Sequence, residues 1–333
     1  MRRSRSFVLG AASIVATLSL TNGCSPAGGF KITPVPSDQS LEERIVIRER
    51  GWVSDRIALI DISGVLLNGR SFGLLSEGEH IVGLIVEQLD KAARDRRVKA
   101  VVLRINSPGG TVTASDILYE EIRRFREKTG KPVIAYFQDV AASGAYYLAC
   151  AADEIVAQRT SVTGSIGVIM QMVDVSGAMA VLGIKADAIK SGPFKDAGSP
   201  LRTMAPEERA VFQSMVDGFY QQFVDVVDAG RPGLSREQVL TLADGRVYIA
   251  SQAKEKGLVD EIGTMRDALA AAKKRAGVKA AHVVMYHRPL DWRPNVYSQA
   301  PAAGGPTVNL FNINMPFDWT QRPRFMYIWD SRD

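Results

Sequence analysis

The chain alternates between short, mainly apolar runs and longer segments in which apolar residues return at helical spacing. The apolar runs are rich in Val, Ile and Leu and cover residues 56–66, 98–110, 131–138 and 153–158. The segments between them predict helices at 79–95, 113–130 and 143–152. Strands that lack clear alternation and are separated by helices are typical of a parallel sheet covered on both faces. The pattern therefore predicts an α/β fold.

The rest of the pattern divides the chain into parts. Residues 205–275 have a helical pattern and extend the same domain, whereas the flanking regions are rich in turn-forming residues. The predicted parts are an export signal or short membrane anchor at 1–24, a tether at 25–55, one folded domain at 56–290 and a tail rich in Pro, Gly and aromatic residues at 291–333.

The first 24 residues have the three-part layout of an export signal. Three arginines precede 14 uncharged, mostly apolar residues, and small residues follow. Such a run is short for a bilayer span, which needs about 20 residues, but an uncleaved short anchor stays an alternative. Cys24 follows a glycine as in bacterial lipoprotein cleavage sites, so a lipid anchor at Cys24 is a third reading. Each reading predicts an exported domain at the bacterial membrane, on its extracytoplasmic side.

Composition narrows the function classes. A hydrophobic content of 46% predicts a folded chain. The net charge of +5 is small for 333 residues and comes without a block of like charges, so nucleic acid is not an expected partner. The two cysteines, Cys24 and Cys150, give no disulfide framework, and Cys150 is expected to be buried.

Three predicted strand ends carry runs of small residues, and in open α/β sheets such ends form binding sites. The runs are NSPGG at 106–110, AASG at 141–144 and SVTGSIG at 161–167. The two glycines of NSPGG permit a sharp turn whose amides could face a developing negative charge, although an ordinary tight turn is the simpler reading. Neither a P-loop nor a dinucleotide fingerprint is present.

Ser143 has two readings, a helix cap and a nucleophile, because it lies where an apolar strand gives way to an alanine-rich helix. A nucleophile needs a base, and no histidine lies within 60 residues of Ser143. A desolvated lysine can replace histidine. Lys195, in the loop-like stretch IKSGPFKDAGSP, is the candidate, with Lys190 as its local competitor and an ordinary solvent-exposed lysine as the alternative.

Together these motifs resemble the SppA family of signal peptide peptidases, whose fold is like that of the Clp protease subunit and the crotonases. The resemblance covers about residues 55 to 275 and rests on five stretches in order: INSPGG, DVAASGAYYLACAADEIVA, TGSIGVI, IKSGPFKDAGSP and DGRVYIASQAKEKGLVDEIG. It implies that Ser143 is the nucleophile and Lys195 the general base. It also implies that Ser165 orients Lys195 and that oxyanion amides come from Gly144 and from Gly109 or Gly110.

The resemblance further implies a peptide hydrolase without metal or other cofactor, acting on cleaved signal peptides and other unfolded apolar segments. This chain carries one copy of the fold, and the single-copy form implies a ring of protomers in which one protomer's lysine approaches its neighbour's serine. A crotonase-like acyl-CoA enzyme and an inactive membrane-associated scaffold stay as alternatives. A separate hypothesis from the sequence is that the aromatic stretch RFMYIWD near the end folds back towards the cleft.

Overall fold

The computed structural model describes residues 40–68, 72–73, 76–77, 81–288 and 325–329. The predicted export segment with Cys24 lies outside the described residues, as do positions 25–39 of the predicted tether and most of the predicted tail.

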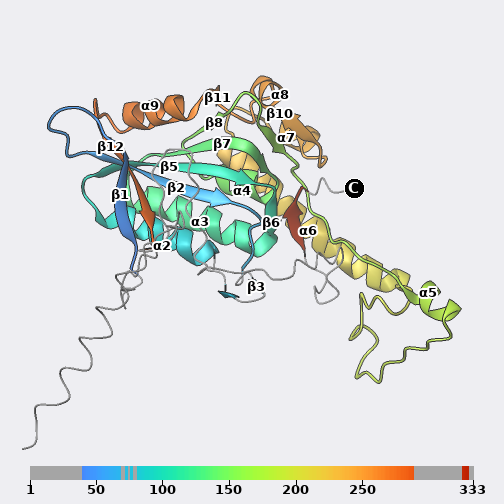
Figure 1. The fold of residues 1–333 in the computed structure, drawn as a ribbon. Coiled ribbons are helices and arrows are strands. Elements are labelled where there is room, and N and C mark those ends of the chain that lie inside the picture. The colour runs from blue at the N-terminus through green and yellow to red at the C-terminus, as the bar shows by residue number, and fades with distance from the viewer. Residues whose placement is uncertain (1–39, 69–71, 74–75, 78–80, 289–324, 330–333) are drawn as a thin grey trace, which may run out of the picture. The chain divides into compact units, whose positions relative to one another are not determined.

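Nine described strands form one mainly parallel sheet (Figure 1). Its main path runs in the order β1 (Glu42–Ile47), β12 (His282–His287), β2 (Arg56–Ser63), β5 (Val98–Ser107), β7 (Val133–Ala142), β8 (Glu154–Ala157) and β11 (Glu261–Ile262). β9 (Val162–Gly164) pairs with the end of β7 and with β10 (Val247–Ile249). Two small sheets pair β3 (Phe72–Gly73) with β4 (Ser76–Glu77), and β6 (Gly109–Thr111) with β13 (Met326–Ile328).

Helices cover both faces of this sheet, as Figure 1 shows. α2 (Ile81–Arg94), α3 (Val112–Thr129) and α4 (Gly144–Ala149) lie on one face and α9 (Met265–Arg275) on the other. Alternate residues of each central strand enter different cores: Ala58 and Ile60 pack on the α2–α3 side, whereas Ile57 and Leu59 pack on the α9 side. The predicted parallel α/β fold with helices on both faces is confirmed.

The remaining described helices follow β9 in the chain. They are α5 (Ser176–Val181), α6 (Pro206–Gly230), α7 (Arg236–Leu242) and α8 (Ala250–Glu255). The buried apolar side chains of α6, Phe223, Val224, Val226 and Val227, all lie in its second half, and α5 has no buried residue.

α3 fixes the glycine-rich turn that precedes it. The Thr111 hydroxyl caps the helix by accepting a hydrogen bond from the Ala114 N–H at 3.3 Å, and Gly130 ends the helix in the left-handed conformation. Because β6 runs directly into α3, the NSPGG turn is held between β5 and a capped helix.

Two described segments differ from the predicted boundaries. Residues 42–47, expected in the tether, form strand β1 and pair with the edge strand β12. Residues 325–329, expected in the tail, pair with β6. Both runs are short, so their periodicity carries little information and only the pairing partner makes them strands.

No helix in the described ranges is both long enough and apolar enough for a membrane span.

A buried ion pair joins two central strands. Arg104 of β5 is 1% exposed, and its guanidinium binds the Asp61 carboxylate of β2. Asp61→Ala would leave a buried cation without its carboxylate, so urea denaturation should show a loss of about 3–5 kcal/mol in the free energy of unfolding. Asp90→Ala, which removes an exposed pair with Arg94, should cost less than about 1 kcal/mol. Equal losses for the two variants would contradict this account.

Candidate active site

Ser143 is the single residue between β7 and α4. Its N–H donates to the Gly164 carbonyl at 2.8 Å, and its own carbonyl accepts the Tyr147 N–H at 2.9 Å. These bonds hold the backbone at φ 53° and ψ −119°, which side-chain-bearing residues rarely adopt. The hydroxyl makes no capping bond; Oγ is buried and has no hydrogen-bond partner among the described residues. The structure therefore does not support the helix-cap reading.

The glycine-rich turn lies directly against this junction. A Cβ at Gly109 would lie 2.7 Å from the Gly144 nitrogen and 3.1 Å from the Ala142 carbonyl oxygen, so no larger residue fits there. Gly109 also has a φ of 101°, which glycine tolerates. The side chain of Asn106 ties the turn to β7 by accepting the Val140 N–H at 3.2 Å. The structure thus brings the predicted residues Gly109, Ser143 and Gly144 together.

The backbone groups of the turn point alternately to two sides. On one side, the Leu66 N–H donates to the Gly109 carbonyl and the Thr111 N–H donates to the Leu66 carbonyl, both at 2.8 Å. The Gly109 N–H donates to Ser107 Oγ at 3.1 Å. Because successive residues of a strand alternate in direction, the Gly110 N–H points to the other side. Of the two glycines that the sequence left open, Gly110 is therefore the one whose amide faces away from Leu66.

Ser165 lies beside Ser143. Ala142 and Gly164 are paired on the parallel strands β7 and β9, and the two serines directly follow them. Ser165 also has a positive φ, 50°, and its N–H donates to the Arg246 carbonyl at 2.8 Å. Two strained serines at adjacent strand ends mark this edge of the sheet.

Lys195 is exposed, in the segment between α5 and α6. Its competitor Lys190 forms an ion pair with Asp196 at 2.6 Å, and Arg202 binds the same carboxylate. Hydrogen bonds from Arg202 and Lys190 hold the pKa of Asp196 well below its usual range. Arg202 also binds Glu208 in the first turn of α6, which fastens the lysine loop to that end of the helix.

The described chain does not join Lys195 to Ser143. Glu208 and Phe223 are separated by about 22 Å along α6, at 1.5 Å per residue. Phe223 packs against Tyr147, one turn after Ser143, with ring centroids 5.1 Å apart. The lysine loop is thus fastened at the far end of α6 from the serine, in agreement with the lack of a partner for Ser143 Oγ.

Other candidate groups for the same chemistry lie elsewhere or are inert. His282 and His287 lie on β12, which β2 and β5 separate from β7. Burial raises the pKa of the Cys150 thiol to about 12, so this cysteine stays protonated. Its predicted burial is confirmed.

The aromatic stretch near the end of the chain lies on the glycine-rich turn. Met326–Ile328 form β13 and pair antiparallel with β6. Met326 also exchanges two backbone hydrogen bonds with Ile169, at 2.9 and 3.0 Å. The hypothesis that this stretch folds back onto the site is confirmed for residues 325–329.

Comparison with known proteins identifies the family. The model of peptidase family S49 matches residues 125–279, and that of Clp protease matches residues 54–191. A putative signal peptide peptidase SppA from Enterococcus faecium is 36% identical over 250 residues, which cover 75% of this chain and 71% of that protein. The chain belongs to peptidase family S49. This result confirms the resemblance read from the sequence and supports serine protease activity.

Two further relatives match this S49 chain over different shares of their own length. A putative protease of Methanocaldococcus jannaschii is 42% identical over 201 residues, which cover 60% of this chain and 64% of that protein. Protease 4 of Haemophilus influenzae is 35% identical over 222 residues, or 67% of this chain. The match spans only 35% of the length of Protease 4.

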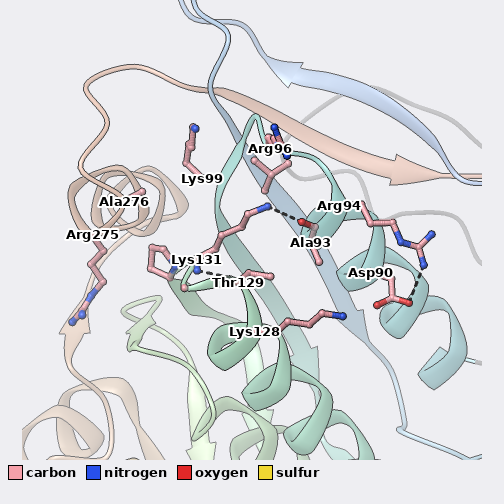
Figure 2. A pocket seen from close by; sticks show the side chains of 13 residues that line it. Asp90, Ala93, Arg94, Arg96, Lys99, Lys128, Thr129, Lys131, Arg275 and Ala276 are labelled. Carbon is pink, nitrogen blue, oxygen red and sulfur yellow. Dashed lines mark hydrogen bonds and ion pairs between the residues drawn. The ribbon is translucent and has the colours of Figure 1, made fainter.

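An open cavity of this S49 peptidase, about 640 Å³ in volume, lies away from Ser143. Figure 2 shows it at the amino-terminal ends of β5 and β7, surrounded mainly by basic side chains. Lys131 is directed at the end of α2, where its Nζ donates to the carbonyls of Ala92, Ala93 and Asp95. Open α/β sheets place their sites at the opposite, carboxyl ends of the strands. The cavity is therefore separate from the candidate active site.

Sequence reasoning missed the aromatic cluster beneath the serine and the Asp196–Arg202–Glu208 network. The rings of Tyr147, Phe223 and Tyr327 contact one another, with centroids 4.7–5.1 Å apart. Helical spacing places Phe219 and Phe223 on one face of α6, but it does not reveal which segment covers them.

Strain at Ser143 predicts an unusual response to substitution. Both Ser143→Ala and Ser143→Gly should abolish peptide hydrolysis. The free energy of unfolding of the glycine variant should exceed that of the alanine variant by about 1–2 kcal/mol, because glycine accepts the positive φ. Thermal or urea unfolding measures the difference. Ser214, exposed in the middle of α6, is the matched control: there glycine should be less stable than alanine by about 1 kcal/mol. The same order at both positions would refute strain at Ser143.

Proposed function

We propose that this S49 peptidase is a membrane-associated serine endopeptidase that cleaves apolar peptides, including signal peptides already removed from their precursors. Ser143 is the nucleophile and Lys195 the general base. The observation that supports this best is the buried, unbonded hydroxyl of Ser143 at a strained strand-to-helix junction beside the glycine-rich turn.

In the proposed mechanism, Lys195 transfers protons and the glycine amides stabilise the negative charge. Neutral Lys195 takes the Ser143 proton while Oγ attacks the peptide carbonyl. The N–H groups of Gly144 and Gly110 stabilise the oxyanion, and the protonated lysine then gives its proton to the leaving amine. Water releases the acyl group with the same lysine as base. Ser165, beside Ser143, orients the lysine.

The lysine comes from a second copy of the chain. Within one chain its loop is fastened about 22 Å along α6 from the level of Ser143, so a neighbour offers the shorter route. The segment around α5 also leaves large apolar side chains exposed: Val181, Leu182, Ile184, Ile189, Phe194 and Leu201. An exposed apolar surface of this kind is typical of protein interfaces. We infer a closed ring in which each interface completes one site.

Membrane association and substrate choice rest on separate features. Residues 1–24 would export the domain and hold it at the membrane, as a signal, a short anchor or a lipid anchor at Cys24. Signal peptides are apolar, and an extended peptide can pair with a strand edge such as that of β6, which β13 occupies in this structure. The relative from Enterococcus faecium carries the name signal peptide peptidase.

The two alternatives have less support. An acyl-CoA enzyme of the crotonase type gives no role to Lys195, and an inactive scaffold gives no reason for the strained backbone of Ser143.

The test measures hydrolysis of an apolar reporter peptide by variants and their mixtures. Ser143→Ala and Lys195→Ala should each lower kcat by several powers of ten. After dissociation and reassembly, an equal mixture of the two should recover up to about a quarter of wild-type activity, because random ring neighbours then supply one intact serine and one intact lysine.

Lys190→Ala is the matched control because Lys190 is already paired with Asp196. A mixture of Lys190→Ala and Ser143→Ala should be no more active than the Lys190→Ala protein that it contains. Full turnover by Lys195→Ala would overturn the proposed base. If Ser143→Ala and Lys195→Ala are each inactive and their mixture also stays inactive, the two residues of the dyad belong to one chain.

A further inference from the structure

The loops that lead into the parallel strands gather at the end of the sheet opposite Ser143. β2, β5, β7 and β12 run parallel to one another. The loops that precede them therefore lie along one edge, which we call the entry end of the sheet: residues 48–55, 95–97, 130–132 and 276–281. The length of β7 separates this edge from Ser143 by about 30 Å, at about 3.3 Å per residue.

A tryptophan forms the tip of the first of these loops. The side chain of Trp52 is fully exposed, and Arg48 and Arg50 beside it are exposed as well. Figure 1 shows this loop, in blue, projecting from the sheet. Tryptophan has a large apolar ring with one polar N–H, and it is enriched where a membrane meets water. An exposed tryptophan with cations around it is therefore typical of an anchor at a membrane surface.

The loop is fastened at both of its ends. The Glu49 N–H donates to His282 Nδ1 at 3.0 Å, and the Glu49 carboxylate pairs with Lys273 at 2.8 Å. At the other end of the loop, the Asp55 carbonyl accepts the His282 N–H at 2.8 Å. These bonds hold the loop against β12 and α9, so the exposure of Trp52 is a fixed feature of the fold.

Positive charge exceeds negative charge at the entry end. The carboxylates on or beside its loops are already in ion pairs: Glu49, Asp55, Asp90, Asp95, Asp153 and Glu154. A set of exposed cations there has no ion-pair partner in the described part of the chain: Arg48, Arg50, Arg96, Lys128, Lys274 and Lys279. Figure 2 shows Arg96 and Lys128 on two sides of the open cavity at this end. The cavity thus offers anionic groups a hollow between unpaired cations.

Helix ends explain only part of this charge. Cations in the last turn of a helix stabilise its carboxyl end, which accounts for Lys128 on α3 and Lys274 on α9. Arg48, Arg50 and Arg96 lie in loops, outside the described helices. These three arginines have no structural role of this kind.

We propose that the entry end is a docking face for a membrane surface that contains anionic phospholipids, with Trp52 inserted among the headgroups and the unpaired cations bound to their phosphates. The domain then has a contact with the bilayer in addition to residues 1–24. The edge that carries Ser143 faces away from the membrane, so peptides reach it from the solvent side. This inference goes beyond the proposed function and uses neither Ser143 nor Lys195.

Quenching of tryptophan fluorescence by vesicles with brominated acyl chains tests the proposal on the full chain. The chain has four tryptophans, so the Trp52 contribution is the difference between the wild type and Trp52→Phe. We expect vesicles of phosphatidylglycerol to quench Trp52. Vesicles of phosphatidylcholine, which carry no net charge, should quench it at least about fivefold less. Addition of about 0.5 M NaCl should weaken the quenching, because salt screens exposed charges.

A charge-reversed variant tests the role of the cations. Combined Arg96→Glu and Lys128→Glu should lower the quenching of Trp52 at limiting phosphatidylglycerol at least about tenfold, since each cation near such a surface contributes about fivefold. Arg159→Glu is the matched control, because Arg159 is exposed and follows β8 at the opposite end of the sheet. Its quenching should stay within about twofold of the wild type. Thermal unfolding of each variant shows that it folds.

The other outcomes each overturn a part of the proposal. If Trp52 stays unquenched while the chain floats with the vesicles, residues 1–24 alone hold the protein and the docking face is wrong. Equal quenching by charged and neutral vesicles, or equal losses in the double variant and Arg159→Glu, would overturn the role of the cations. Release of Trp52 by inorganic phosphate at fixed ionic strength would indicate a site for a free anion instead of a lipid. The peptide assay of the dyad variants tests the proposed function separately.

Discussion

The site depends on one backbone constraint, the contact between the glycine-rich turn after β5 and the Ser143 junction after β7. A side chain at Gly109 would collide with the Gly144 nitrogen, so only glycine lets the turn approach this closely. The Ser143 N–H donates to the Gly164 carbonyl and the Ser143 carbonyl accepts the Tyr147 N–H, and these two bonds hold Ser143 at a positive φ. The strained backbone keeps the hydroxyl out of the helix-capping geometry, and within the described part of the chain the hydroxyl has no hydrogen-bond partner. The parallel sheet supplies this constraint, because it brings the carboxyl ends of neighbouring strands to one edge.

The proposed catalytic groups come from two different parts of the structure. The proposed nucleophile, Ser143, and the proposed oxyanion amides of Gly110 and Gly144 belong to the packed centre of the domain. The lysine belongs to a loop that Asp196, Arg202 and Glu208 fasten to the exposed end of α6. Under the proposed mechanism, activity would depend on assembly of the ring.

The sequence was informative where the pattern is long or the chemistry is local. α3 could be predicted because Ile117, Leu118, Ile122 and Phe125 repeat at helical spacing. The serine, the glycine-rich turn and the lysine loop were named from their motifs. β1 and β13 could not be predicted, because short runs become strands only through a distant partner. Nor could the sequence choose between Gly109 and Gly110, since that choice depends on which way each amide points once Leu66 is paired.

The most direct test of the central claim is a crystal structure of the assembled protein in which the distance from Ser143 Oγ to the nearest Lys195 Nζ is measured. The account predicts about 3 Å, a hydrogen bond, with the lysine contributed by a neighbouring copy and Ser165 beside both groups. An assembly in which no lysine reaches any Ser143, although it hydrolyses peptides in the same crystals, would contradict it.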